Sequence, residues 1–96
     1  MPGWMLESTE PEIVLRLPEG AVKTVGRTAR ADFIVEAPLV SRLHCRLTAS
    51  ESDQLVVEDL KSTNGTLVNG TRVDRAVLKT GDVLTVGRVE FRVVPG

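Results

Sequence analysis

Short apolar runs without helical spacing are the feature that most restricts how this chain can fold. Valine-rich segments recur along the whole sequence, and none of them keeps the three- and four-residue spacing of an amphipathic helix. In one segment Leu43, Cys45 and Leu47 alternate with His44 and Arg46, so the two sets face opposite sides of a strand. The pattern predicts a chain built from half-buried β-strands.

Turn-forming residues separate these runs. Ten strands are expected, and they cover residues 4–7, 12–17, 22–25, 33–35, 43–48, 54–59, 66–68, 71–73, 82–86 and 89–94. Glycine and asparagine favour tight turns, and they occur in Pro18-Glu19-Gly20, Asn64-Gly65, Asn69-Gly70 and Thr80-Gly81-Asp82. Many short strands without crossover helices close as a barrel or as two packed sheets. We expect an all-β, antiparallel sandwich, with Phe33, Phe91 and Trp4 as the largest core side chains.

Length and rare residue types exclude several classes of protein. The 96 residues suffice for one domain, which we expect to span residues 1–96. A single cysteine, Cys45, and a single histidine, His44, leave no intramolecular disulfide and no structural zinc site, so no metal or cofactor is expected. No apolar run is long enough to span a membrane, and the acidic start is unlike a signal peptide. The expected location is intracellular and reducing.

The charge balance directs attention to individual arginines. Twelve basic residues against 13 acidic residues give a net charge of -1, which disfavours general binding to nucleic acid or to acidic lipid. Nine of the basic residues are arginines, whose guanidinium groups bind carboxylate or phosphate oxygens in bidentate fashion. Most surface arginines simply form the solvent-exposed face or edge of a strand, so the positions of these arginines decide whether they form a binding site.

Three loops combine arginine with hydroxyl and amide groups. Arg27 follows Gly26 where a strand ends, Ser41 and Arg42 precede the next alternating strand, and residues 61–66 leave the strand that ends at Asp59. If these loops meet at one end of a sandwich, they present two guanidiniums, hydroxyls, an amide side chain and free backbone N–H groups. Such a set of donors suits a phosphate dianion.

The same residues resemble a known family. The chain is similar to the forkhead-associated (FHA) domain from about residue 22 to residue 94, in family-like order and spacing. Each motif alone is a weak signal, and their succession in register is a strong one. The motifs are Gly26-Arg27, Ser41-Arg42-Leu43-His44, Ser62-Thr63-Asn64-Gly65-Thr66, Val68-Asn69-Gly70, Thr80-Gly81-Asp82 and Val86-Gly87.

This resemblance implies a fold and a ligand. The fold is an FHA/SMAD-like antiparallel β-sandwich of about eleven strands, and loops at one end bind phosphothreonine in a partner protein. Arg27 would pair with the phosphate, Ser41 would donate its hydroxyl to it, and Arg42 would add a second cation. Thr63 would make a further phosphate contact, and Asn64 would hold the peptide backbone.

Other family residues would support the site. Gly26, His44, Gly65 and Asn69 would hold the loops in place, although Asn69 is equally explained as a turn residue beside Gly70. The resemblance also implies that apical loop side chains contact the third residue after the phosphothreonine. The candidates are Leu39, two residues before Ser41, and the stretch 50–53, and Leu39 would favour an apolar residue there. Where the family often has alanine, this chain has Cys45, which the alternation turns toward the core as a small apolar side chain.

Three other functions compete with phosphothreonine binding. Ser41, His44 and Asp59 have the side chains of a hydrolytic triad, but the sequence lacks a nucleophile elbow, so neither an enzyme nor a small-molecule substrate is expected. Nucleic-acid binding is disfavoured by the net charge and by the shortage of aromatic residues. A phosphate-independent protein-interaction sandwich domain with an unused pocket remains the main alternative.

Overall fold

The computed structural model describes residues 3–50 and 52–96. In those residues every regular element is a β-strand, and no helix is long and apolar enough to cross a membrane. The strands are β1 (Gly3–Thr9), β2 (Glu12–Pro18), β3 (Val22–Gly26), β4 (Phe33–Ile34), β5 (Cys45–Ala49), β6 (Leu55–Asp59), β7 (Thr66–Val68), β8 (Thr71–Val73), β9 (Arg75–Leu78), β10 (Val83–Val86) and β11 (Val89–Pro95).

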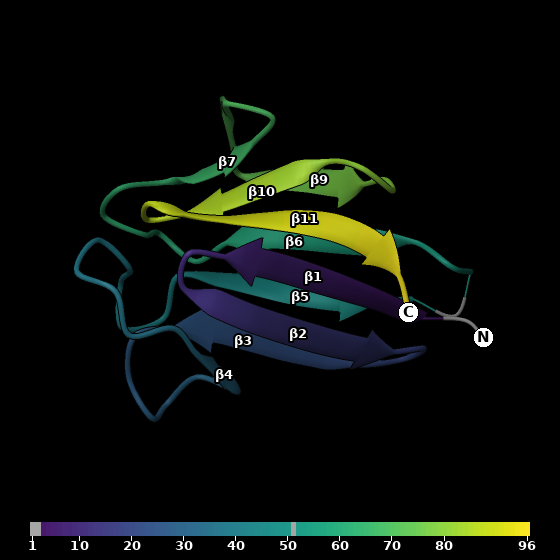
Figure 1. Cartoon of the computed structure of the whole chain (residues 1–96), viewed down its shortest axis with the longest axis horizontal. Coiled ribbons are helices and arrows are strands. Elements are labelled where there is room, and N and C mark those ends of the chain that lie inside the picture. Colours follow the sequence, from purple (N-terminus) through teal and green to yellow (C-terminus); the bar gives the residue numbers. More distant parts are fainter. Residues whose placement is uncertain (1–2, 51) are drawn as a thin grey trace.

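Two sheets pack face to face, as expected for a sandwich. The six-stranded sheet has the order β2-β1-β11-β10-β7-β8, and the five-stranded sheet has the order β4-β3-β5-β6-β9. In Figure 1 the first sheet lies in front of the second, and β1 and β11 run side by side. Neighbouring strands are antiparallel, except that β4 pairs parallel with β3 through Val25 and Phe33. The predicted all-β sandwich is confirmed, with this one parallel pair as a departure.

Alternating side chains from both sheets fill the interior. Phe91 is completely buried, as predicted. Phe33 and Trp4 are only partly buried and pack against the core from its margin, so the prediction that both are among the largest core side chains is wrong. For Phe33 the reason is that β4 is a two-residue strand at the edge of the five-stranded sheet. The fully buried leucines are Leu6, Leu17, Leu47, Leu55, Leu78 and Leu84.

The sequence pattern missed one strand. β9 pairs antiparallel with β6, with Ala76 opposite Val57 and Val77 opposite Val56. Its apolar run shows no alternation because Val77 faces outward and remains 44% exposed, although it is a valine. With β9 included, the described residues contain eleven strands, the number that the family resemblance implied.

Cys45 is a core side chain, as its alternation with Leu47 predicted. It has no exposed surface and lies on β5 opposite Asp59 of β6. Burial raises the pKa of the Cys45 thiol to about 12, and the nearby Asp59 carboxylate adds to this rise. The thiol is therefore neutral at physiological pH and fills space in the core.

We predict that Cys45 is unreactive in the folded protein. With a pKa of about 12, only about one thiol in ten thousand is a thiolate at pH 8. A chromogenic disulfide reagent should therefore react slowly in buffer and within seconds in urea, where the pKa returns to about 8.5. Because the pKa is raised by folding, the stability linked to the neutral thiol is complete below about pH 8.5 and declines at higher pH. Rapid labelling in buffer would contradict the prediction.

The loops that follow β3, β4, β6 and β10 gather at one end of the sandwich, which we call the apical end. Figure 1 shows this end on the left, and the chain ends after β11 on the right. Loops from both sheets therefore lie on a common surface. This arrangement brings together residues that are far apart in the sequence.

Candidate functional site

A hollow of about 420 Å³ opens at the apical end, and we call it the apical pocket. Its walls come from the start of the β3–β4 loop, the β4–β5 loop and the β6–β7 loop. All five residues predicted to bind a phosphopeptide line it, and Leu39 does so as well. The lining residues are Arg27, Pro38, Leu39, Val40, Ser41, Arg42, Leu43, Lys61, Thr63 and Asn64.

Arg27 is anchored on one side and open on the other. Its backbone N–H donates to the carbonyl of Ser41 at 2.9 Å, which joins the end of β3 to the β4–β5 loop. Its Nε donates to the carbonyl of Val40 at 3.0 Å. The two terminal guanidinium nitrogens have no hydrogen bond to any described residue, so they remain available to an anion.

Gly26 allows the two backbones to approach this closely. A Cβ at residue 26 would lie 2.1 Å from the carbonyl oxygen of Arg42 and 2.8 Å from its carbonyl carbon. These are backbone atoms, so no side-chain rotation could relieve the clash. Glycine at residue 26 is therefore a condition for placing Arg27 beside Ser41 and Arg42.

We predict that Gly26→Ala weakens both folding and binding. Separating the β3 end from the β4–β5 loop should cost about 1–3 kcal/mol in the free energy of unfolding, measured in urea. The same shift moves Arg27 away from Arg42, so affinity for a phosphopeptide should fall as well. Gly20→Ala is the control, because its Cβ meets nothing within 4 Å and the strain of its positive φ lies away from the pocket. Unchanged binding by Gly26→Ala would refute the prediction.

A hydrogen bond orients the hydroxyl of Ser41. The backbone N–H of Thr63 donates to Ser41 Oγ at 3.0 Å, which ties the β6–β7 loop to the β4–β5 loop. Since the oxygen accepts this bond, its own proton is free to point into the apical pocket. Ser41 is thus arranged as a donor toward a bound anion.

His44 connects the same two loops from beneath. The alternation of β5 turns it outward, yet it is completely buried, because the loops cover it. Its Nδ1 accepts the backbone N–H of Ser41 at 3.1 Å. Nε2 lies 2.8 Å from the carbonyl of Gly65 and donates to it, because a carbonyl can only accept. The imidazole is therefore a neutral bridge with its proton on Nε2.

Asp59 organises the β6–β7 loop, a role that the sequence motifs do not indicate. Its carboxylate accepts hydrogen bonds from the backbone and side chain of Ser62 and from the Thr66 hydroxyl, the last at 2.8 Å. Burial alone would raise the pKa of Asp59, but the hydrogen bonds from Ser62 and Thr66 outweigh it and hold the pKa below its usual value. The only sequence signal was its place at the end of a strand before a hydroxyl-rich loop.

These hydrogen bonds also show that Ser41, His44 and Asp59 are not arranged as a hydrolytic triad. Both ring nitrogens of His44 are used by backbone groups of Ser41 and Gly65, and Ser41 Oγ is bonded to Thr63. Asp59 bonds to hydroxyls of its own loop. Ser41, His44 and Asp59 therefore hold loops together and do not form a relay from nucleophile to base.

Asn64 joins the β6–β7 loop to the other wall of the pocket. Its Nδ2 donates to the carbonyl of Leu39 at 3.0 Å, and its Oδ1 has no described partner. Gly65 follows with a positive φ of 86°, and its N–H donates to the Ser62 hydroxyl at 2.9 Å. The loop thus turns sharply after Asn64 and leaves the free amide oxygen exposed at the pocket.

Asn69 is the one predicted support residue that lies away from the pocket. It occupies the β7–β8 turn with Gly70, and their φ values of 51° and 84° are those of the expected type I′ hairpin. Its side chain bonds to the Asp82 carboxylate at 3.0 Å and to the backbone N–H of Val83 at 2.9 Å. Asn69 therefore supports the start of β10, at the opposite end of β7 from Thr66.

The pocket collects positive charge that no carboxylate of the described residues pairs with. Among residues 3–50 and 52–96 the only ion pair is Arg46–Glu58, which lies on the outer face of the five-stranded sheet. Lys61 lies at the rim beside Arg27 and Arg42, although no motif indicates it as a site residue. Lys61 has a left-handed backbone, with φ of 58°, at the start of the hydroxyl-rich loop. The only feature of the sequence that points to Lys61 is its positive charge in the hydroxyl-rich loop of residues 61–66.

The described residues contain no cluster of three or more histidine, cysteine, aspartate or glutamate side chains that could hold a metal ion. The donors around the apical pocket are instead guanidinium, ammonium, hydroxyl, amide and backbone N–H groups. All of them are suited to an anionic oxygen ligand.

Sequence similarity identifies the family to which this site belongs. The family model of the FHA domain matches residues 23–87, which is more than half of the chain and includes every residue lining the apical pocket. The chain belongs to the FHA domain family. The resemblance inferred from the motifs is confirmed, and FHA domains are protein-interaction modules.

Individual relatives of this FHA domain are similar over most of its length. It is 41% identical over 75 residues to the ABC transporter ATP-binding/permease protein Rv1747 of Mycobacterium tuberculosis, covering 78% of this chain and 8% of that protein. It is 38% identical over 74 residues to the glycogen accumulation regulator GarA of the same species, covering 77% and 44%. The chain thus spans less than half the length of these relatives.

A solved structure shows the same fold. An FHA domain from a structural and functional study of phosphothreonine-dependent FHA domain interactions superposes with a TM-score of 0.88. The two sequences are 30% identical, and the alignment covers 98% of this chain and 97% of the other. The similarity therefore includes both sheets and the apical loops.

Proposed function

We propose that this FHA domain binds phosphothreonine in partner proteins and peptides through the apical pocket, and that residues 1–96 act as one such module. The observation that carries the proposal is the set of cations around a single open hollow, none of them paired with a described carboxylate. The solved neighbour comes from work on phosphothreonine-dependent interactions. The domain would mediate association that depends on phosphorylation of the partner.

Each proposed contact uses a group that the fold leaves free. Arg27 offers its terminal nitrogens to two phosphate oxygens, while its Nε stays bonded to Val40. Ser41 offers its hydroxyl proton. Arg42 adds a second exposed guanidinium, and the Thr63 side chain completes the cradle.

A phosphoryl group fits this set better than a carboxylate does. It carries a charge of about -1.5 to -2 near neutral pH and three acceptor oxygens, against one charge and two oxygens for aspartate. Two guanidiniums and two hydroxyls would leave donors unused around a carboxylate. An aspartate at the phosphothreonine position should therefore bind poorly.

Asn64 and Leu39 are placed to contact the peptide beside the phosphate. The free Oδ1 of Asn64 can accept a backbone N–H of the peptide, because Nδ2 is already held by the Leu39 carbonyl. The Leu39 side chain is half-buried at the pocket wall, where it offers an apolar surface to a neighbouring peptide side chain. In this proposal these residues position the peptide, and the cations bind its phosphate.

The domain is proposed to be non-catalytic. No step of a reaction is assigned to Ser41 or His44, because the hydrogen bonds of both are used to hold loops. Its ligand would be a protein segment, with no small-molecule substrate, nucleic acid or membrane involved. Binding itself is the function, and dephosphorylation of the partner would end it.

We predict a modest contribution from Lys61. An exposed ammonium at the rim adds Coulomb attraction without a fixed hydrogen bond, so Lys61→Ala should weaken phosphopeptide binding about threefold to tenfold, measured by calorimetry in low salt. The effect should shrink in high salt. Lys79→Ala is the matched control, because it removes the same charge from the turn after β9, away from the pocket. Equal losses from both substitutions would contradict a local role.

The proposed function is tested with four peptides that differ only at one position, which carries phosphothreonine, phosphoserine, threonine or aspartate. Fluorescence anisotropy should show binding of the phosphothreonine peptide, weaker binding of the phosphoserine peptide, and no measurable binding of the other two. Equal binding of all four peptides would overturn the proposal in favour of a phosphate-independent interaction domain.

A further inference from the structure

A row of uncharged side chains crosses the outer face of the five-stranded sheet. Its members lie opposite one another on β3, β5, β6 and β9, and their neighbours Leu47 and Val57 are core residues, so the row faces outward. We call it the valine row, and it consists of Val22, Thr48, Val56 and Val77. Val22 and Val77, at its two ends, remain 54% and 44% exposed. The valine row is therefore an apolar strip that reaches across four strands.

A charged row lies beside the valine row, one step closer to the apical end. On β3 it begins with Thr24, whose backbone N–H and hydroxyl donate to the Asp32 carboxylate at 2.9 Å and 3.1 Å. These hydrogen bonds hold the pKa of Asp32 below its usual value, so the carboxylate is ionised at neutral pH. Arg46, Glu58 and Arg75 follow on β5, β6 and β9. The charges therefore alternate in sign across the sheet.

The charged row is complementary to its own reverse. From β3 to β9 the signs are negative, positive, negative and positive, and from β9 to β3 every position has the opposite sign. If two copies meet face to face around a two-fold axis along the strands, between β5 and β6, each row lies over the reverse of the other. Arg46 of one copy then faces Glu58 of the other, and Arg75 faces the Asp32 carboxylate. Each copy thus offers the charges that the other requires.

We propose that the outer face of the five-stranded sheet binds a second copy of this domain and forms a two-fold dimer around that axis. The valine rows cover each other, with Val22 of one copy on Val77 of the other. The charged rows stack as alternating ion pairs beside them. A two-fold interface uses the same patch on both copies, which a row complementary to its own reverse satisfies. Sheets packed face to face keep their strand directions within about 30° of each other, and this axis permits that arrangement.

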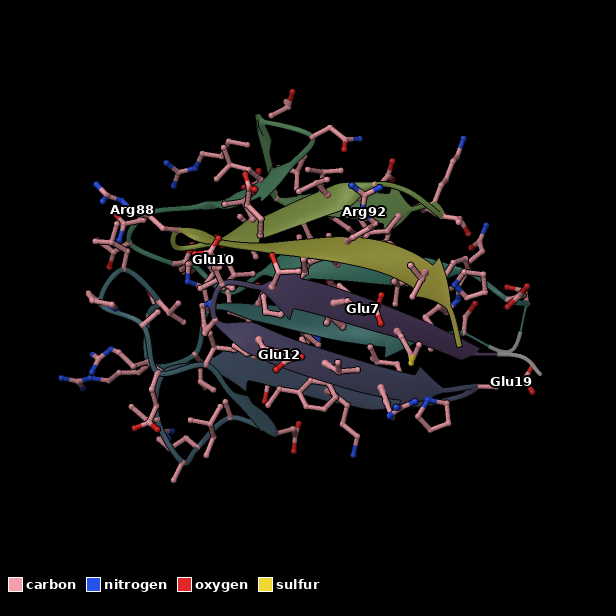
Figure 2. The ribbon with its side chains drawn as sticks, viewed as in Figure 1. Glu7, Glu10, Glu12, Glu19, Arg88 and Arg92 are labelled. Atoms are coloured by element: carbon pink, nitrogen blue, oxygen red, sulfur yellow. The ribbon has the colours of Figure 1, made fainter. Side chains whose placement is uncertain are left out.

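The outer face of the six-stranded sheet is less suited to such packing. Figure 2 shows Glu7, Glu12 and Arg92 on this face. Glu7 lies opposite Arg92, and Arg16 lies opposite Met5, so charged side chains interrupt neighbouring rows of this sheet. The five-stranded sheet instead separates its apolar and charged side chains into two adjacent rows, which is why we assign the interface to it.

The interface is small, so the dimer should be weak and reversible. Four strands about 4.8 Å apart and two rows about 7 Å apart cover roughly 300 Å² on each copy. Stable complexes of standard size bury about 800 Å² on each partner. We therefore expect a dissociation constant on the order of 100 μM.

The dimer would present two apical pockets at the same end. The strands of the five-stranded sheet run lengthwise between the apical end and the opposite end in Figure 1. Rotation about an axis along these strands leaves that direction unchanged, so both pockets open to the same side. A partner with two phosphothreonines would bind both pockets at once and gain avidity. This consequence rests on the proposed function, whereas the dimer itself does not.

Sedimentation equilibrium of the domain without peptide, at concentrations up to about 1 mM, tests the dimer. The wild type should show a monomer–dimer equilibrium. Arg46→Glu and Glu58→Arg each place like charges over one another across the axis, so each variant alone should dimerise at least about tenfold more weakly. An equimolar mixture of the two variants should dimerise again, because two negative positions of one copy then face two positive positions of the other. This restoration cannot arise from a variant that merely fails to fold.

Arg92→Glu is the matched control, because it reverses the same charge on the outer face of the other sheet, as Figure 2 shows. It should dimerise as the wild type does. A wild type that stays monomeric at about 1 mM would overturn this inference and leave the proposed function standing. A dimer that both single charge reversals leave unchanged, or a mixture that stays monomeric, would overturn it as well.

A peptide with two phosphothreonines on a flexible linker of about 20 residues tests the orientation of the pockets. Calorimetry should show that the second domain binds about tenfold more tightly than the first. Arg46→Glu should lose this cooperativity and keep the wild-type affinity for a single phosphothreonine, since Arg46 lies outside the apical pocket. A dimer without cooperativity would overturn the common orientation. A domain that dimerises but binds no phosphothreonine peptide would overturn the proposed function and leave the dimer standing.

Discussion

Replacement of Arg27 by alanine is expected to abolish measurable phosphopeptide binding. Its terminal nitrogens are the donors that the fold holds open over the apical pocket, while Nε is fixed to the Val40 carbonyl. Charged hydrogen bonds contribute about 1.5–3 kcal/mol each, so the loss of two should weaken binding by at least about a hundredfold. Titration calorimetry with the phosphothreonine peptide measures the change.

Two further arginine variants make this result specific. Arg27→Lys keeps the charge but loses both the fork and the anchor to Val40, so its affinity should fall between those of the wild type and Arg27→Ala. Arg92→Ala removes an arginine from an outer sheet face, and its affinity should equal that of the wild type. An Arg27→Ala protein that binds within threefold of the wild type would contradict the assignment.

Replacement of His44 by alanine is expected to damage both stability and binding. The completely buried imidazole satisfies the N–H of Ser41 and the carbonyl of Gly65. Without it a cavity forms and both backbone groups lose their partner, which should cost about 3–5 kcal/mol in the free energy of unfolding. Because the free energy of unfolding of a typical domain is only about 5–15 kcal/mol, this loss should produce a large shift in a urea titration.

The binding defect of the His44 variant should exceed what partial unfolding explains. At temperatures where the variant is still folded, the β4–β5 and β6–β7 loops would no longer be joined, so phosphopeptide affinity should remain reduced. Thr48→Ala is a matched control on the same strand, since Thr48 lies on the outer face of the sheet and should change stability by under about 0.5 kcal/mol. Stability within 1 kcal/mol of the wild type, together with normal affinity, would refute the bridging role of His44.

The strand pattern was largely predictable, and its exceptions have local causes. Alternation is readable wherever one face of a strand is buried, as in β5 and β11. β9 was not predicted because Val77 is a valine that faces outward, so apolar and polar residues do not alternate along this strand. Phe33 was placed too deep in the core because its sequence does not show that β4 lies at a sheet edge.

The candidate site was predictable only in part. The motifs named the residues of three loops, and all of the proposed ligand contacts do line one hollow. The same motifs do not show that Asn69 lies away from the apical pocket, because an Asn-Gly hairpin turn has the same local sequence wherever it lies in the fold. Lys61 belongs to no motif, and its importance comes from its position beside Arg27 and Arg42 at the apical pocket.

Neighbouring residues along the chain determined the strand period, the hairpin turns and membership of the FHA family. These features depend on local backbone preferences and on motif order, which the sequence displays directly. Only the tertiary structure decided that Arg27, Arg42 and Lys61 share a pocket, in which none of them pairs with a carboxylate of the described residues. The physical reason is that these cations come from separate loops, whose meeting depends on how two sheets pack and on the backbone contact that Gly26 permits.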